Sequence, residues 1–285
     1  MTTSQNPPTS LRKLRILLAE DNLVNRVLAQ KLLQRNGHTV SLAVNGKDVV
    51  ALWEASQPNS FDIILMDIQM PVMDGLQATS YIRATEAVLQ AGSCAKDKPA
   101  IHIPIVAMTA HAMKGDRERY LAGGMDGYIS KPINSADLER SMQSVVSTFT
   151  ASTPDKNQLA AAEPAPLPAL LPIEASDILA AFDNDLELVR ELAELFISES
   201  PKYVLQMRDA LRDYDAKALF NSAHALKGSV GNFSTKGPHA TALRIEILAK
   251  AGELAGVLEI LEALEGQLAQ LHEILLGMAK QTALR

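Results

Sequence analysis

The chain has 285 residues, enough for two domains of ordinary size that each bury a core of their own. Its net charge of −6 provides no basic field that would hold nucleic acid or an anionic membrane surface. The single cysteine, Cys94, excludes an intrachain disulfide and favours a cytoplasmic location. We find no apolar run of about 18 residues, the length that a membrane-spanning helix requires, so no membrane segment is expected in this chain.

The first half of the chain alternates short apolar runs with helical patterns. Each run is rich in aliphatic or β-branched residues, and such alternation is typical of a parallel sheet with helices on both faces. We therefore predict a doubly wound, five-stranded α/β domain of the flavodoxin-like type over residues 12–148. The five expected strands are residues 14–19, 38–43, 61–66, 103–108 and 127–130.

The composition changes twice in the second half of the chain. Residues 149–172 are dominated by alanine, proline and small polar residues, which is the composition of a linker. From residue 173 to 285 the pattern is helical, and apolar residues recur every three or four positions. Burying four such stripes favours an all-α antiparallel four-helix bundle. The longest two stripes are Leu186, Val189, Ala193 and Phe196, and Leu254, Leu258, Leu261, Leu264, Leu268, Leu271 and Leu275.

Acidic residues follow two of the expected strands. Glu20 and Asp21 come directly after the first strand, and Asp67 comes directly after the third. Ligands of an open α/β sheet bind at the carboxyl ends of its strands, where these three side chains should converge. Because three close carboxylates repel one another, we expect a cation between them, and Mg²⁺ prefers such hard oxygen ligands.

A hydroxyl and an ammonium group complete the set at the ends of the last two strands. Thr109 follows the fourth strand, and Lys131 follows the fifth and precedes Pro132. Two acids, an acceptor acid, a hydroxyl and a lysine, together with the segment Met-Pro-x-Met-Asp-Gly after Asp67, resemble the receiver (response-regulator) domain. The resemblance covers the whole predicted α/β domain.

This resemblance implies a role for each residue of the site. Asp67 would be the phosphoacceptor, which forms an acyl phosphate. Glu20, Asp21 and Asp67, with the backbone carbonyl of Gln69, would hold Mg²⁺. One departure is Glu20, which stands where aspartate is commonest in the family, and we expect altered metal affinity rather than loss.

Three further features are implied by the same resemblance. Lys131 and Thr109 would contact the phosphoryl oxygens, and the Lys131–Pro132 peptide bond would be cis. Tyr128 occupies the position of the aromatic residue that swings inward when the threonine moves toward the phosphate. A half-buried core tyrosine explains Tyr128 equally well.

The helical half contains one histidine in distinctive company. In Ala223-His224-Ala225-Leu226-Lys227-Gly228, helical spacing puts His224, Lys227 and Gly228 on one face. Glycine inside a helix costs about 1 kcal/mol relative to alanine. Its presence suggests access for a docking partner, and the Lys227 ammonium would balance the charge of an attached phosphoryl group. The segment resembles the histidine phosphotransfer (HPt) domain, in which His224 would be the phosphoacceptor.

A receiver domain followed by an HPt domain resembles the C-terminal portion of bacterial hybrid sensor histidine kinases. This resemblance implies a phosphorelay in which Asp67 accepts a phosphoryl group from an upstream sensor histidine kinase and exchanges it with His224, which passes it to a downstream response-regulator receiver domain. An ATP-binding kinase domain is not recognised, so we expect no autophosphorylation by this chain. An alternative is an interaction module, switched by phosphorylation, in which the bundle only docks. Whether transfer is intrachain, and whether the chain is a cytoplasmic fragment of a membrane-bound sensor, stay open.

Overall fold

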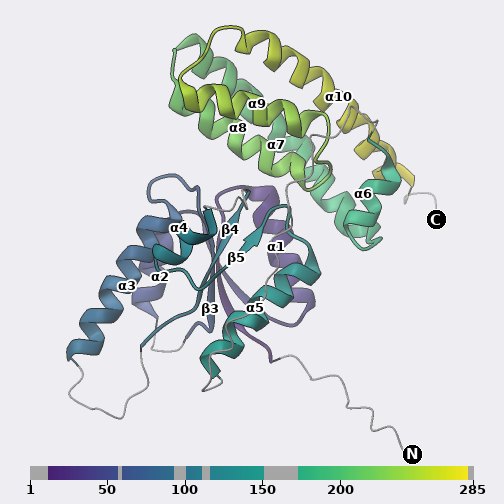
Figure 1. Cartoon of the computed structure of the whole chain (residues 1–285). Helices are drawn as coiled ribbons and strands as arrows, with labels where there is room; N and C mark the ends of the chain where they lie inside the picture. The colour runs from purple at the N-terminus through teal and green to yellow at the C-terminus, as the bar shows by residue number, and fades with distance from the viewer. Residues whose placement is uncertain (1–11, 57–59, 93–100, 111–115, 151–172, 282–285) are drawn as a thin grey trace, which may run out of the picture.

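The structure is a computed structural model that describes residues 12–56, 60–92, 101–110, 116–150 and 173–281. Cys94 and most of the segment expected to be a linker lie outside these ranges. The expected order of an α/β domain followed by a helical domain is confirmed, and both are visible in Figure 1.

A five-stranded parallel sheet forms the centre of the first domain. Its strands are β1 (Arg15–Ala19), β2 (Thr39–Ala43), β3 (Ile63–Asp67), β4 (Ile105–Thr109) and β5 (Gly127–Ser130), in the order β2-β1-β3-β4-β5. This is the predicted doubly wound topology. Asp67 and Thr109 are the last residues of β3 and β4 rather than the first residues beyond them. Both side chains therefore start from hydrogen-bonded backbone, which fixes their positions at the sheet edge.

Helices cover both faces of the sheet. One apolar cluster joins the sheet to α1 (Leu23–Arg35) and α5 (Ser135–Thr150), and a second joins it to α2 (Gly46–Ala55), α3 (Gly75–Gly92) and α4 (Asp116–Ala122). Helix α5 thus ends at Thr150, two residues inside the segment predicted as linker. The central strands β3 and β4 are buried along their whole length, as expected for a sheet packed on both sides.

Four long helices form the bundle. They are α7 (Leu186–Arg212), α8 (Ala216–Gly231), α9 (Pro238–Ala251) and α10 (Val257–Gln281), and the short α6 (Ala175–Ala181) packs against α7 and α10. Each long helix contacts two of the others, so the apolar stripes meet in one core. Two expected members of the α10 stripe are wrong: Leu254 precedes the helix, and Leu258 is 47% exposed. The buried seam begins instead at Val257, and a helical residue one position further points about 100° away.

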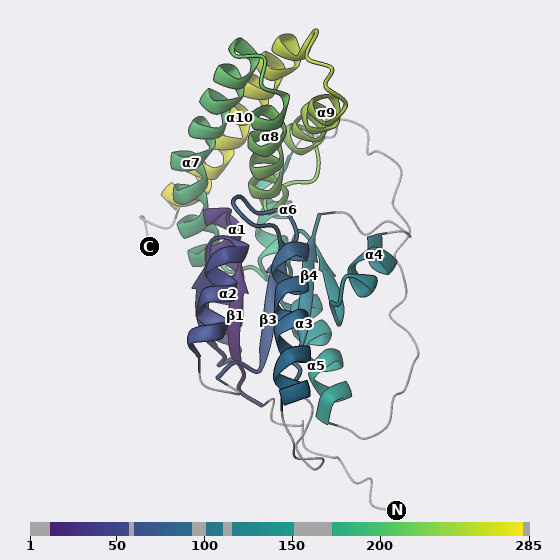
Figure 2. The same ribbon diagram turned by 90° about the vertical axis from the view of Figure 1, so that its left-hand side faces the viewer.

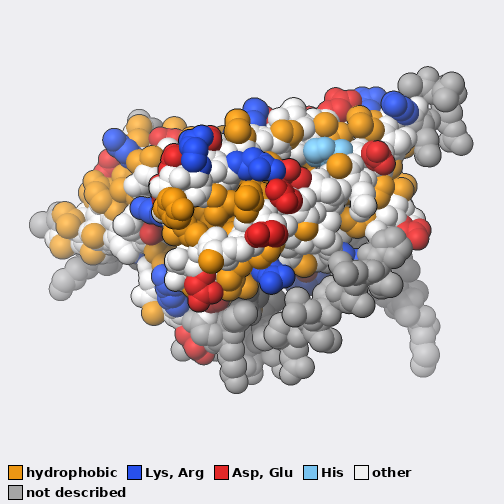
Figure 3. All heavy atoms as spheres, turned by 90° about the horizontal axis from the view of Figure 1, so that it is seen from above, with side chains coloured by type: hydrophobic (Ala, Val, Ile, Leu, Met, Phe, Trp, Pro, Cys, Tyr) orange, Lys and Arg blue, Asp and Glu red, His pale blue; other side chains and the backbone are white. Residues whose placement is uncertain are grey.

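The bundle lies over the carboxyl ends of the strands. Figures 1 and 2 show α7 and α8 above the sheet edge and beside the first turn of α1. Figure 3 shows the side of the bundle that faces away from the sheet, where charged side chains of both signs lie among hydrophobic ones. Within the described residues, none of the helices combines the length and apolarity needed to cross a bilayer.

Candidate functional site

The three predicted acids meet at the carboxyl edge of the sheet. Glu20 is fully buried, Asp67 is buried, and Asp21 is partly exposed. One oxygen from each of Glu20, Asp21 and Asp67 lies within 4.8 Å of the others. Glycine at position 75 permits this packing on the α3 side, because a Cβ there would lie 2.2 Å from the backbone oxygen of Asp67. The glycine that ends the Met-Pro-x-Met-Asp-Gly motif is therefore required for steric reasons, because no side chain fits at position 75.

Lys131 supplies the positive charge of this cluster. Its Nζ lies 2.6 Å from Asp67 Oδ2 and 2.7 Å from Glu20 Oε2. The Lys131–Pro132 peptide bond is cis, as the sequence led us to expect. Burial opposes the lysine charge, but Asp67 and Glu20 outweigh that effect and raise the pKa of Lys131. The ammonium group is therefore held charged between the two carboxylates.

One lysine does not neutralise three carboxylates. Burial and the Asp67 charge raise the pKa of Glu20 to about 8, and the same two causes raise the pKa of Asp21 to about 6. Glu20 Oε2 is buried and makes no hydrogen bond beyond its ion pair with Lys131. Clustered hard oxygens with excess negative charge are the donor set that suits a small divalent cation. These residues therefore fit the magnesium ion expected from the sequence.

The remaining predicted residues of this edge surround Asp67. The backbone N–H of Gln69 donates to Asp67 Oδ1 at 3.3 Å, which places the Gln69 backbone beside the acceptor. Thr109 is buried, and its hydroxyl lies 3.0 Å from the hydroxyl of Tyr120 on α4. Tyr128, which the sequence suggested as the switch, packs partly buried against the cluster that α2, α3 and α4 cover. Sequence reasoning missed Tyr120, which spacing alone does not relate to Thr109.

A second charged group surrounds His224 on α8. Glu246 on α9 accepts on both oxygens: Oε1 is 2.7 Å from His224 Nδ1, and Oε2 accepts from Lys227 Nζ at 2.6 Å. Burial opposes ionisation of Glu246, but His224 and Lys227 outweigh it and lower its pKa to about 2. An ionised Glu246 can only accept, so Nδ1 carries a proton, and in the neutral ring Nε2 is the nitrogen with the free lone pair. Phe220 stacks on the imidazole with ring centroids 6.0 Å apart.

Two aspects of the His224 group were not foreseen. The Lys227 ammonium is buried on Glu246, so its predicted direct role beside a phosphoryl group remains a prediction. Glu246 was missed, although the sequence holds a signal for it. It lies between Ala242 and Ala249 on the buried stripe of α9, where a charged residue needs a partner.

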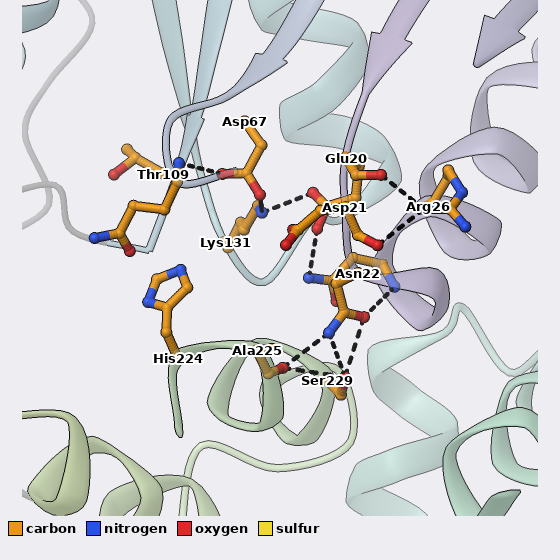
Figure 4. Close-up of polar contacts among 12 residues, drawn as sticks. Glu20, Asp21, Asn22, Arg26, Asp67, Thr109, Lys131, His224, Ala225 and Ser229 are labelled. Atoms are coloured by element: carbon orange, nitrogen blue, oxygen red, sulfur yellow. Dashed lines mark hydrogen bonds and ion pairs between the residues drawn. The ribbon is translucent and has the colours of Figure 1, made fainter. Parts of the chain in front are cut away.

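The two groups face each other across the domain interface. Figure 4 shows His224 projecting from α8 toward Asp67 and Lys131. The side chain of Asn22, next to Asp21, donates to the backbone oxygen of Ala225 at 2.8 Å and exchanges hydrogen bonds with Ser229. Two ion pairs between α1 and α7, Lys31–Glu191 and Arg35–Asp185, lie further along the interface.

Comparison with known proteins assigns the two domains. Residues 16–143 match the family described as response regulator receiver domain, and residues 191–274 match the Hpt domain family. The chain thus carries a receiver domain followed by an Hpt domain. This pair forms a two-component phosphorelay module.

Curated relatives include much longer kinases. Sensor protein GacS of Pseudomonas syringae pv. syringae is 34% identical over 232 residues, which cover 78% of this chain and 23% of that protein. Hybrid signal transduction histidine kinase I of Dictyostelium discoideum is 44% identical over 122 residues, which cover 42% of this chain and 6% of that protein. The chain spans less than a quarter of these relatives. The sequence resemblance suggested a bacterial protein. Because the relatives include a eukaryotic kinase, similarity does not restrict the chain to bacteria.

Two solved structures match about half of the chain. A co-crystal structure of the Saccharomyces cerevisiae phosphotransfer protein Ypd1 with the receiver domain of Ssk1 matches with 28% identity and a TM-score of 0.44, covering 49% of this chain and 93% of that chain. The receiver domain of the Pseudomonas aeruginosa sensor kinase PA1611, described with magnesium in its active-site cleft, matches with 36% identity and a TM-score of 0.39. This match covers 48% of this chain and 99% of that chain.

Proposed function

We propose that Asp67 accepts a phosphoryl group from a phosphohistidine of an upstream sensor kinase and exchanges it with His224 of the same chain. The observation that carries this proposal is the facing arrangement of the two groups, with His224 turned toward the acidic edge that holds Asp67. The proposed units are a receiver domain at 12–148, a linker at 149–172 and an HPt domain at 173–285.

The first step takes place at Asp67. A carboxylate oxygen attacks phosphorus, the new O–P bond forms, and the P–N bond to the donor imidazole breaks while that imidazole retains a proton. Lys131, already paired with Asp67, would place its ammonium against the negative charge that develops on the phosphoryl oxygens. The Thr109 hydroxyl, which contacts the Tyr120 hydroxyl in this structure, would turn to donate to the same group. Bound Mg²⁺, held by Glu20, Asp21, Asp67 and the Gln69 carbonyl, would offset charge on the phosphoryl oxygens.

The second step takes place at His224. The Nε2 lone pair attacks the acyl phosphate, an N–P bond forms, and the O–P bond breaks to regenerate the Asp67 carboxylate. The Nδ1 proton stays on the ring, where the Glu246 carboxylate accepts its hydrogen bond and stabilises the positive charge that develops. Lys227 keeps Glu246 ionised and so acts on the imidazole through it.

The interface implies an order of events for partners. While α8 covers the acidic edge, an upstream phosphohistidine cannot reach Asp67, and a downstream receiver cannot reach His224. The two domains must therefore separate between exchanges, with the connecting segment keeping their effective concentration high. An upstream sensor histidine kinase and a downstream receiver domain are the proposed partners, and the proposed location is cytoplasmic.

Phosphosite mapping tests this proposal. The full chain is incubated with acetyl phosphate and Mg²⁺, and base-labile acyl phosphate is distinguished from acid-labile phosphoimidazole. We expect both kinds of label in the parent, only the base-labile label in His224→Gln, and neither in Asp67→Asn. Asp74→Asn is the matched control, because it makes the same change at a partly exposed carboxylate that caps α3.

Two results would overturn parts of the proposal. Normal labelling of Asp67→Asn would mean that another residue is the acceptor. An acyl phosphate in the parent that never gives label at residue 224 would remove the relay and leave a receiver that switches interactions, with the bundle as a docking surface.

A further inference from the structure

Asn25, in the first turn of α1, contacts both domains through one side-chain amide. It is 5% exposed. Its Nδ2 donates to Glu20 Oε1 at 3.0 Å, and its Oδ1 accepts from Nδ2 of Asn232, at the end of α8, at 2.7 Å. In its ionised form, the form that pairs with Lys131 and would bind a cation, the Glu20 carboxylate only accepts, so it fixes which end of the amide faces it. The oxygen is left facing the bundle, where it needs a donor, and Asn232 is that donor.

The bundle leaves room for Asn25 at the HPt glycine. A Cβ at Gly228 would lie 3.1 Å from Asn25 Nδ2, closer than ordinary van der Waals contact. The missing side chain therefore admits the amide as well as giving access to His224. Asn25 lies between Gly228 and Asn232 on one side and Glu20 on the other.

The other contacts of the interface do not involve Glu20. Asn22 bonds Ala225 and Ser229, and Lys31 pairs with Glu191 on α7. These contacts hold the domains together, but none of them touches the Glu20 side chain, so they do not position its carboxylate. Asn22 also accepts from Asn25, but at the Asn25 backbone N–H. Among the described contacts, the path that reaches the Glu20 carboxylate through side chains at every step is Asn232 to Asn25 to Glu20.

We propose that Asn25 is a positioning residue that couples docking of the bundle to cation binding at the acidic edge. When the bundle docks, Asn232 holds the Asn25 amide, and the amide holds Oε1 of Glu20. Oε2 then stays directed toward Lys131 and Asp67, where a cation would bind. By linkage, a cation that binds better to the docked chain strengthens docking by the same factor. This inference rests on the proposed role of Glu20 as a metal ligand.

Cation affinity of the full chain tests this coupling. Mn²⁺, a paramagnetic substitute for Mg²⁺, is titrated into the parent, Asn232→Ala and Ser229→Ala, and free Mn²⁺ is measured by electron paramagnetic resonance. Each variant removes one side chain that hydrogen-bonds to an asparagine at the start of α1, but only the partner of Asn232 holds the Glu20 carboxylate with the same side chain. We expect roughly fivefold weaker Mn²⁺ binding in Asn232→Ala, the factor that matches one hydrogen bond of about 1 kcal/mol. Ser229→Ala should bind Mn²⁺ like the parent.

A second variant checks the route. On an Asn25→Ala background, Asn232→Ala should cause no further loss of Mn²⁺ affinity, because the path is already broken. An equal loss in Asn232→Ala and Ser229→Ala, or no loss in Asn232→Ala, would overturn the coupling. Label at Asp67 with saturating Mg²⁺ is read separately in the parent, so a failure of the proposed function is distinguished from a failure of this coupling.

Discussion

The Asp67 group and the His224 group contain the same kinds of charged residue in different proportions. At the sheet edge, three carboxylates face one ammonium, so full ionisation would leave two negative charges without a partner. On the bundle, one carboxylate faces one ammonium beside an imidazole, so the charges balance. The pKa values follow this contrast, since the pKa of Glu20 is raised to about 8 and that of Glu246 is lowered to about 2.

The contrast assigns different tasks to the two lysines. Lys131 contacts the proposed acceptor Asp67 directly, whereas Lys227 contacts Glu246, which contacts the proposed acceptor His224. The Asp67 group has excess negative charge, which a bound cation would offset. The bundle group is complete and holds its histidine in one tautomer before any phosphoryl group arrives. Differences of this kind are testable one residue at a time.

The largest effect is expected from Lys131→Ala. Removing the charge that would contact the phosphoryl oxygens should slow labelling of Asp67 by acetyl phosphate about a hundredfold to a thousandfold. Mg²⁺ affinity should stay equal or increase, because the ammonium competes with a cation for the same carboxylates. Labelling rates and a metal titration measure the two quantities, with Lys47→Ala on the exposed face of α2 as control. A large loss of Mg²⁺ affinity would contradict this assignment.

A smaller effect is expected from Glu246→Gln. The substitution keeps an acceptor for Nδ1 of His224 but removes the charge that stabilises the imidazole and balances Lys227. Loss of a charge-assisted hydrogen bond of about 1.5–3 kcal/mol corresponds to roughly a tenfold to hundredfold slower appearance of label at His224. The rate of Asp67 labelling should not change, and a parallel fall in both rates would indicate a general folding defect.

The pH dependence of stability sharpens the same point. The pKa of Glu246 in the folded chain is about 2, below its ordinary value of 4.5, so its ionised form stabilises the fold above pH 4.5. That contribution should decline as the pH falls from about 4.5 toward 2. Urea unfolding followed by circular dichroism measures it as the difference in free energy of unfolding between the parent and Glu246→Gln. A difference that does not shrink on acidification would contradict the charged Lys227–Glu246–His224 arrangement.

Much of the fold was predictable because its signals are local. Five strands, the order of the domains and the residues at the carboxyl edge follow from apolar runs and from what comes directly after them. The error at Leu258 has a local origin too. Counting leucines alone carried the stripe through Leu258, whereas the buried position beside it is occupied by a valine, Val257.

The contacts that the sequence did not predict are made between distant segments. Glu246 reaches His224 from another helix, Tyr120 reaches Thr109 from α4, and Asn25 reaches Asn232 from another domain. No spacing in the sequence relates such pairs. A charged residue on a buried stripe, as at Glu246, indicates that a partner exists without saying which one.

The rate of transfer from Asp67 to His224 as a function of chain concentration tests the central claim most directly. The parent is labelled with acetyl phosphate and Mg²⁺ and freed of donor, and acid-labile label at His224 is followed over time. The docked arrangement predicts a first-order rate that does not depend on concentration, with little transfer in a mixture of Asp67→Asn and His224→Gln chains. A rate that rises in proportion to concentration, or no label at His224, would contradict exchange within one chain.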